Sequence, residues 1–279
     1  MHLAREIVQG KTTLTPSEID HLCAKLWDLY SDEPNIVETP DQDAYYIGDL
    51  HGDLRSAELV RDRILQKRAS SFIFLGDYVD RGPAQIETIN LVMALAIENS
   101  SRVLMIRGNH ESREVSSRYG FRDAVLDQYS KETYDTYCNA FKVLPLAGFT
   151  RSGVFACHGG IPEGVNSLEE IQKLNRMYED FTSPTLWQLV WNDPADDPSR
   201  FRPSLRGGNS RYFGAIAFRE FTKATGIARF IRAHEVFQSG YKTFFGGKLV
   251  SVFSTSYNRG IQPRILRLDS DTKITPIDL

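Results

Sequence analysis

The chain has 279 residues, a mass of 31.7 kDa and a formal net charge of −3, which suits one large domain or two small ones. This charge argues against a broad basic surface for nucleic acid or an anionic membrane. Its three cysteines are too few for a disulfide framework, and no apolar run approaches the ~18 residues of a membrane span. We therefore expect a cytoplasmic protein with no nucleic-acid or membrane partner.

The first half of the chain predicts strands that alternate with helices. Residues 1–40 form a polar lead-in with one helix, for which Thr15 or Ser17 is the expected cap. The strands that follow are apolar and the helices between them are amphipathic; in chain order they are 45–47, 54–68, 72–75, 83–99 and 103–106. A strand–helix order of this kind predicts a largely parallel sheet with right-handed crossovers.

The second half predicts shorter strands joined by tight turns. Its apolar runs, in chain order, are 154–156, 230–231, 243–245, 248–253 and 264–268. Gly246-Gly247 is a suitable hairpin turn, and residues 192–212 are predicted to be a long surface loop because they are rich in Asp, Pro, Gly and Arg. No linker divides the chain. We expect one α/β domain over 1–279, with two packed mixed β-sheets flanked by helices and an active site at the carboxyl ends of the strands.

Five of these strands end in a short polar cluster. The clusters are Gly48-Asp49-Leu50-His51-Gly52-Asp53, Gly76-Asp77-Tyr78-Val79-Asp80-Arg81-Gly82, Gly108-Asn109-His110-Glu111, His158-Gly159-Gly160 and Arg232-Ala233-His234-Glu235. Ligands of open α/β sheets bind outside the carboxyl ends of the strands, so these side chains can converge. Four of the six histidines lie in the clusters.

Each cluster alone has an ordinary explanation. Asp49 and His51 fit a turn, Asp77 fits a cap, and a lone His158 or His234 is more often a hydrogen-bonded structural histidine than a ligand. Turn chemistry does not, however, call for Asp, Asn and His together at five strand ends. Carboxylate and amide oxygens with imidazole nitrogens and no thiolate suit Mn, Fe or Zn, and there are more donors than one ion needs. Two metals about 3.5–4 Å apart activate water and clamp an in-line displacement at phosphorus.

The motifs GDLHGD, GDYVDRG, RGNHE, HGG and RAHE resemble the PPP family of metal-dependent Ser/Thr protein phosphatases, within the calcineurin-like metallophosphoesterases. Other segments resemble the family in the family's own order, up to Gly260: they include Ser117-Arg118-Tyr119-Gly120-Phe121, Trp191-Asn192-Asp193-Pro194 and Ser251-Val252-Phe253-Ser254. The resemblance implies the catalytic core of such an enzyme, in a compact form.

The resemblance also implies two divalent metal ions per chain, with manganese expected first and iron or zinc as alternatives. The implied ligands are Asp49 and His51 for the first ion and Asn109, His158 and His234 for the second, with Asp77 bridging both. The implied reaction is direct attack of a metal-activated water on phosphorus, without a phosphoenzyme.

The remaining implied site residues act on the phosphate and the leaving group. His110 is the general acid for the leaving alkoxide, and Asp80 pairs with it. Arg81 and a second arginine hold the phosphoryl oxygens. We choose Arg206 over Arg211 for the second arginine, because Arg206 begins an Arg-Gly-Gly run. Asn109 also contacts substrate. Tyr257, in the divergent segment 253–260, is assigned to substrate binding.

The predicted function is therefore hydrolysis of phosphoserine and phosphothreonine in phosphoprotein substrates, with regulatory proteins left unidentified. The alternative within the same superfamily is a hydrolase of dinucleoside polyphosphates or small phosphomonoesters, whose metal site would look nearly the same. A nuclease or phosphodiesterase is disfavoured because His234 is followed by Glu235-Val236 rather than by a second histidine. A catalytically dead scaffold is disfavoured because it would need neither the ligands nor His110.

Overall fold

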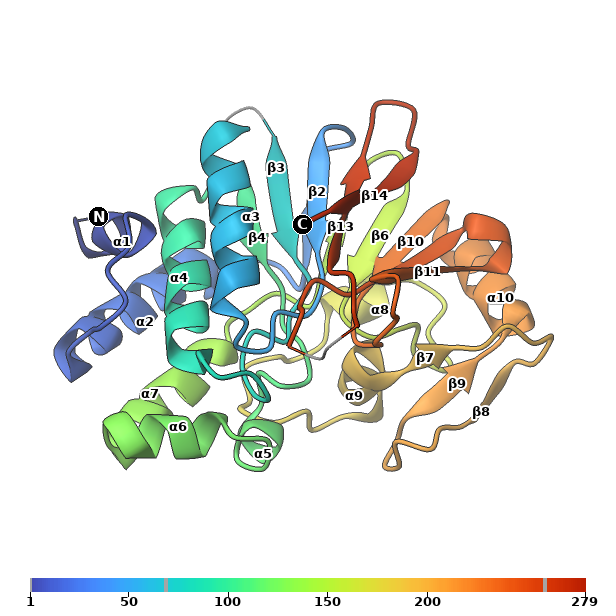
Figure 1. Ribbon diagram of the computed structural model, residues 1–279. Helices are drawn as coiled ribbons and strands as arrows, with labels where there is room; N and C mark the ends of the chain where they lie inside the picture. The colour runs from blue at the N-terminus through green and yellow to red at the C-terminus, as the bar shows by residue number, and fades with distance from the viewer. Residues whose placement is uncertain (1, 68–69, 258–259) are drawn as a thin grey trace.

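The computed structural model describes residues 2–67, 70–257 and 260–279, and two mixed β-sheets form its centre (Figure 1). The first has five strands in the order β14-β13-β2-β3-β4. Strands β2 (Ala44–Ile47), β3 (Ser71–Phe74) and β4 (Val103–Met105) run parallel, which confirms the predicted strand–helix–strand order. Strands β13 (Arg264–Leu268) and β14 (Ile274–Asp278) extend the sheet in antiparallel fashion.

The second sheet has six strands in the order β1-β5-β6-β10-β12-β11. These strands are β1 (Ile36–Glu38), β5 (Ala147–Phe149), β6 (Val154–Cys157), β10 (Arg229–Arg232), β11 (Tyr241–Phe244) and β12 (Leu249–Val252). Strands β6, β10 and β12 are parallel neighbours. The predicted hairpin at Gly246-Gly247 is confirmed: β11 and β12 pair antiparallel across the short helix η1 (Phe245–Gly247).

Helices cover the outer faces of the two sheets (Figure 1). The two long predicted helices are α3 (Leu54–Gln66) and α4 (Gln85–Glu98); Arg68, the expected end of the first, lies outside the described residues. Thr15 is the cap of α2 (Pro16–Tyr30) and makes a capping box with Glu18. The other helices are α1 (His2–Val8), α5 (Arg113–Ser116), α6 (Phe121–Gln128), α7 (Lys131–Phe141), α8 (Leu168–Gln172), α9 (Pro184–Trp191) and α10 (Ala215–Thr225).

Alternation along the buried strands explains why the sheets pack together. In β6, Val154 and Ala156 belong to the apolar cluster that also contains Ile47 and Phe74 of the five-stranded sheet. Phe155, between them, belongs to the cluster formed with α9 and α10. Since successive side chains of a strand point to opposite faces, β6 is buried on both sides. The prediction of two packed mixed sheets flanked by helices is confirmed.

Residues 192–212 are not a surface loop, and that prediction is wrong. They contain strands β7 (Asp193–Pro194) and β8 (Phe201–Pro203) and the start of β9 (Arg211–Phe213), which form a third, small sheet in the order β7-β9-β8. Strands of two or three residues are too short for an alternation pattern to be visible. Among the described helices, none combines the length and the apolar character needed to cross a membrane.

Candidate dimetal active site

The five polar clusters meet at one end of the two sheets, around a cavity of about 450 Å³. Three of them follow β2, β3 and β4 of the five-stranded sheet, and two follow β6 and β10 of the six-stranded sheet. A parallel bridge between Asp49 and Phe253 links the turn after β2 to the turn after β12. The cavity is lined by Asp49, His51, Asp77, Arg81, Asn109, His110, Tyr119, Trp191, Arg206, His234, Glu235, Val236, Phe253 and Tyr257. The sequence-predicted site residues that do not line it are Asp80 and His158, both buried beneath it.

His51 presents an unprotonated nitrogen to two carboxylates. Its Nδ1 lies 2.8 Å from the carbonyl oxygen of Val79, which can only accept, so Nδ1 carries the proton. The other nitrogen, Nε2, lies 3.6 Å from Oδ2 of Asp49 and 3.6 Å from Oδ2 of Asp77. A histidine that donates one ring N–H to a carbonyl and turns its other nitrogen toward carboxylates has the arrangement typical of metal ligands.

His158 lies at the centre of a second group of donors. Its Nδ1 is 2.8 Å from the carbonyl oxygen of Leu75, so Nε2 is again turned inward. That Nε2 lies 2.9 Å from Oδ1 of Asn109, 3.1 Å from Nδ1 of His234 and 3.3 Å from Oδ2 of Asp77. With the proton on Nδ1, Nε2 of the neutral ring carries a lone pair and faces the lone pairs of the Asn109 and Asp77 oxygens. A cation among them would satisfy all four atoms.

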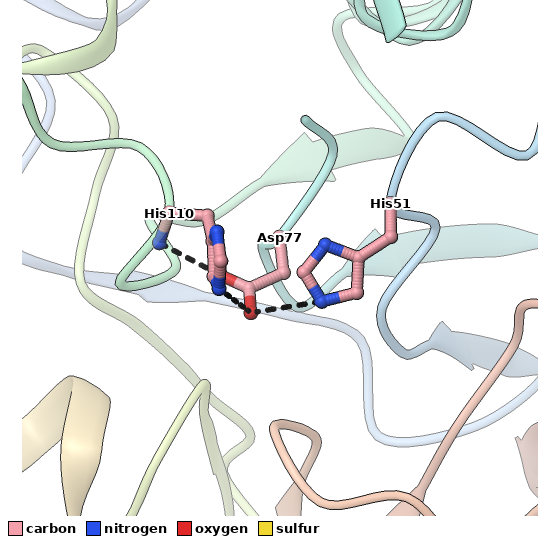
Figure 2. Close-up of side chains that lie close together, drawn as sticks. All are labelled: His51, Asp77 and His110. Atoms are coloured by element: carbon pink, nitrogen blue, oxygen red, sulfur yellow. Dashed lines mark hydrogen bonds and ion pairs between the residues drawn. The ribbon is translucent and has the colours of Figure 1, made fainter. Parts of the chain in front are cut away.

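Asp77 belongs to both groups of donors. One potential metal-holding group is His51, Asp77 and His110, and the other is Asp77, His158 and His234. Figure 2 shows the carboxylate of Asp77 between the imidazoles of His51 and His110. His234 faces this donor group with its Nδ1, which lies 3.1 Å from Nε2 of His158. The donor set of buried oxygens and imidazole nitrogens therefore fits two divalent ions that share one carboxylate.

Burial and crowding of like charges perturb the ionisable groups. Burial and the neighbouring Asp77 raise the pKa of Asp49 to about 6. Burial alone would also raise the pKa of Asp77, but the imidazoles of His158 and His110 bring it well below its ordinary value. Burial and His110 lower the pKa of His51 to about 3, which keeps that imidazole neutral. A neutral imidazole and an ionised bridging carboxylate are the forms that bind metal.

His110 is held by a buried carboxylate. Its Nδ1 lies 2.5 Å from Oδ2 of Asp80, and the residue lines the cavity. Its Nε2 lies 3.9 Å from Oδ2 of Asp77 (Figure 2). Asp80 is itself fixed, because its Oδ1 accepts the backbone N–H of Phe121 at 2.9 Å. Burial alone would lower the pKa of His110, but Asp77 and Asp80 raise it above its ordinary value. The carboxylate of Asp80 thus orients the ring of His110, and Nε2 is left to act toward the cavity.

Among the residues that the structure describes, two arginines line the cavity: Arg81 and Arg206. Arg206 is oriented by Asp193, whose Oδ2 accepts from its Nε at 2.5 Å. Arg211 lies outside the cavity lining and pairs with Glu163 at 3.1 Å. Of the two candidates, Arg206 lines the cavity and Arg211 does not; that Arg206 holds phosphate stays a prediction.

The local backbone is unusual at the site. Among the described residues, eight non-glycine residues have a positive φ, and five of them belong to the strand-end clusters. These five are His51 (45°), Asp77 (56°), Asp80 (71°), Arg81 (68°) and His234 (71°). A left-handed conformation costs a non-glycine residue about 1–3 kcal/mol, and such strain concentrates at functional sites. The packed turns therefore hold these side chains in conformations that an isolated turn would avoid.

Comparison with known proteins identifies the family to which this chain belongs. Residues 45–238 match the calcineurin-like phosphoesterase family. The chain is 33% identical over 278 residues to serine/threonine-protein phosphatase PP1-1 of Saccharomyces cerevisiae, covering 97% of this chain and 88% of the relative. The chain belongs to the PPP family of serine/threonine protein phosphatases.

Two further serine/threonine phosphatases are similar to this chain, one in sequence and one in fold. Serine/threonine-protein phosphatase PP2A-like PPG1 of Candida albicans is 33% identical over 243 residues, which are 86% of this chain; the chain spans only 58% of that relative's length. A solved serine/threonine phosphatase from Saccharomyces cerevisiae, described as similar to human phosphatase PP5, superposes with a TM-score of 0.86 at 25% identity. That match covers 97% of this PPP chain and 92% of the other.

Sequence reasoning missed part of the wall of this PPP site. Trp191 lies with its ring edge-on to His234 at 5.4 Å between centroids, and Tyr119 lies beside His110 at 5.3 Å. Both segments resemble the family, but nothing in their spacing indicates that these two rings border the cavity. Tyr257, which was predicted, lies edge-on to His51 at 5.8 Å. Asn258 and Arg259, the next residues of that segment, lie outside the described residues.

Proposed function

We propose that this protein is a dimetal phosphoprotein phosphatase that hydrolyses phosphoserine and phosphothreonine esters. The observation that carries the proposal is the buried Asp77 carboxylate between two groups of imidazoles, at the base of a cavity lined by two arginines. Membership of the PPP family and relatives named serine/threonine phosphatases support the substrate class.

The metals would be held by Asp49 and His51 on one side, by Asn109, His158 and His234 on the other, and by Asp77 between them. When bound, two divalent ions supply a nucleophile near neutral pH and stabilise the charge that develops at phosphorus. The donor chemistry suits manganese, iron or zinc, and we infer manganese as the first candidate.

The chain's own residues bind the ester and move one proton. Arg81 and Arg206 would hold the non-bridging phosphoryl oxygens, since a planar guanidinium matches them with paired hydrogen bonds. Nε2 of His110 would donate its proton to the leaving serine alkoxide, a poor leaving group without protonation. Asp80 would hold His110 in the required orientation and protonated form. Asn109 and Tyr257, which both line the cavity, would contact the substrate.

We also infer that residues 1–279 act as one catalytic domain. Donors from both sheets contribute to the same centre, so dividing the chain between the sheets would divide the site. All three cysteines are buried and free, which agrees with the expected cytoplasmic location without establishing it. Phosphoproteins are the proposed partners, and regulatory proteins are left open.

A direct comparison of substrates tests the proposal. The manganese-loaded protein is assayed with a phosphoserine peptide, a phosphotyrosine peptide of the same sequence and a dinucleoside tetraphosphate. We expect the highest kcat/KM for the phosphoserine peptide. Preference for the dinucleotide would favour the alternative hydrolase, whereas no hydrolysis of any of the three would refute the function.

A further inference from the structure

The carboxylate of Asp53 connects two segments that are 202 residues apart in sequence. Its Oδ2 accepts hydrogen bonds from Oγ1 of Thr255 at 3.1 Å, from the backbone N–H of Ser256 at 2.8 Å and from Oγ of Ser256 at 2.9 Å. Within its own turn it caps α3, since Oδ1 accepts the N–H of Ser56 at 3.1 Å and Oδ2 accepts the Ser56 hydroxyl at 2.8 Å. A helix cap alone needs only one of these bonds.

The segment that Asp53 holds ends in a residue of the cavity wall. Oγ1 of Thr255, which donates to Asp53, also accepts the backbone N–H of Tyr257 at 3.3 Å. Tyr257 in turn faces His51, two residues before Asp53, with ring centroids 5.8 Å apart. The turn after β2, which carries the predicted ligand His51, is therefore connected to residues 255–257 through the carboxylate of Asp53.

The residues of this segment differ in burial: Thr255 is fully buried, whereas Ser256 is exposed. Ser256 and Tyr257 border a second hollow of about 360 Å³, which Asp53 also lines. The segment is anchored one residue earlier, where the Ser254 hydroxyl donates to the carbonyl of Arg264 at 2.6 Å and accepts the N–H of Gly48 at 2.8 Å. Between Ser254 and Tyr257, both Thr255 and Ser256 are hydrogen-bonded to Asp53.

We propose that Asp53 is a positioning residue that fixes residues 255–257, and through them Tyr257, against the catalytic cavity. The inference rests on the proposed function, in which Tyr257 contacts the phosphoprotein. Asp53 lies outside the lining of that cavity and acts only through the segment it holds. Loss of these bonds weakens binding of substrate and of transition state alike, which raises KM and leaves kcat unchanged.

The test compares the metal-loaded wild type with Asp53→Ser. A serine at this position still caps α3, but it removes the carboxylate oxygen that the segment shares. We expect KM for a phosphoserine peptide to rise about tenfold, with kcat within about twofold and metal content unchanged. In a Tyr257→Ala background, the same substitution should change KM less than twofold. An unchanged KM, or an equal rise in both backgrounds, would overturn the proposal.

Amide hydrogen exchange gives a reading that does not depend on activity. In Asp53→Ser, the amides of 255–257 should exchange at least about tenfold faster, while the Ser56 amide keeps its protection. Ser256→Ala leaves Asp53 in place but removes one of its hydrogen bonds, so KM and the exchange rates should rise by less than in Asp53→Ser. If neither KM nor the exchange rates change in Ser256→Ala, the inference is wrong. If wild-type protein fails to hydrolyse the peptide, the proposed function fails, but exchange still decides whether Asp53 holds the segment.

Discussion

His110 has two possible roles, general acid and metal ligand. Its Nε2 belongs to the donor group of His51 and Asp77, so position alone would allow it to bind metal. Its Nδ1, however, is bonded to Asp80, and nearby carboxylates raise its pKa. A histidine that keeps its proton serves better as an acid than as a ligand, because a metal needs the neutral ring.

Replacement of His110 distinguishes the two roles. For His110→Asn we expect kcat on a phosphoserine peptide to fall about 10²–10⁴-fold, the usual contribution of a positioned general acid. Metal content, measured by atomic emission on the purified protein, should stay the same as in the wild type. A variant that loses metal together with activity would mean that His110 is a ligand.

The two candidate arginines provide a matched pair. Arg206→Lys keeps the charge but loses the paired hydrogen bonds, so kcat/KM should fall about 10–100-fold. Arg211→Lys changes a side chain that pairs with Glu163 outside the cavity lining, and kcat/KM should stay within about twofold. The assignment of Arg206 is wrong if Arg211→Lys has the larger effect.

At the scale of elements, the strand-end turns pack so closely that glycine is required. A Cβ on Gly76 would lie 2.4 Å from backbone atoms of Gly108, and Gly76 has a φ of +99°. Glu111 joins the same two turns by accepting the N–H groups of Asp77 at 2.7 Å and Gly108 at 3.0 Å. The turns after β3 and β4 therefore form one unit around Asp77.

This close approach predicts a large difference between two glycine substitutions. Gly76→Ala should destabilise the protein by about 3–5 kcal/mol, because left-handed strain adds to a backbone clash. Gly226→Ala, at the end of α10, has a similar φ of +75° but open space, and should cost about 1–2 kcal/mol. Urea denaturation measures both, and equal losses would show that the clash is relieved without cost.

Elements with a strong local pattern could be predicted, and those defined by tertiary contacts could not. Strands β2, β3 and β4 are continuous apolar runs, and α3 and α4 are long enough for their periodicity to be visible. Strand β7 has two residues, and its pairing with β9 depends on contacts distant in sequence. The same holds for the residues of the cavity. Those in the strand-end clusters could be predicted from local sequence, whereas Trp191 and Tyr119 reach the cavity through tertiary packing.

For the whole molecule, the proposed metal centre takes its ligands from both sheets. His158 follows β6 and His234 follows β10, while Asp77 follows β3 of the other sheet. Metal bound between them would stabilise only the arrangement in which both sheets are folded and in place. Metal binding and overall stability should therefore be coupled.

Thermal unfolding measures that coupling. At a metal concentration about 100 times Kd, binding stabilises the folded state by about 2.7 kcal/mol, which raises Tm by about 5–10 °C relative to protein treated with a chelator. Asp77→Asn should abolish this rise. Asp28→Asn, at an exposed aspartate of α2, should retain it. A metal-independent Tm for the wild type would contradict a centre built from both sheets.

The most direct measurement combines metal content with phosphoserine hydrolysis in Asp77→Asn, with Asp28→Asn as its control. We predict two metal ions per chain in the wild type and the control. In Asp77→Asn, we predict loss of metal and a fall in kcat of at least about a hundredfold. Undiminished hydrolysis of the phosphoserine peptide by Asp77→Asn would contradict the central claim that this shared carboxylate organises the active site.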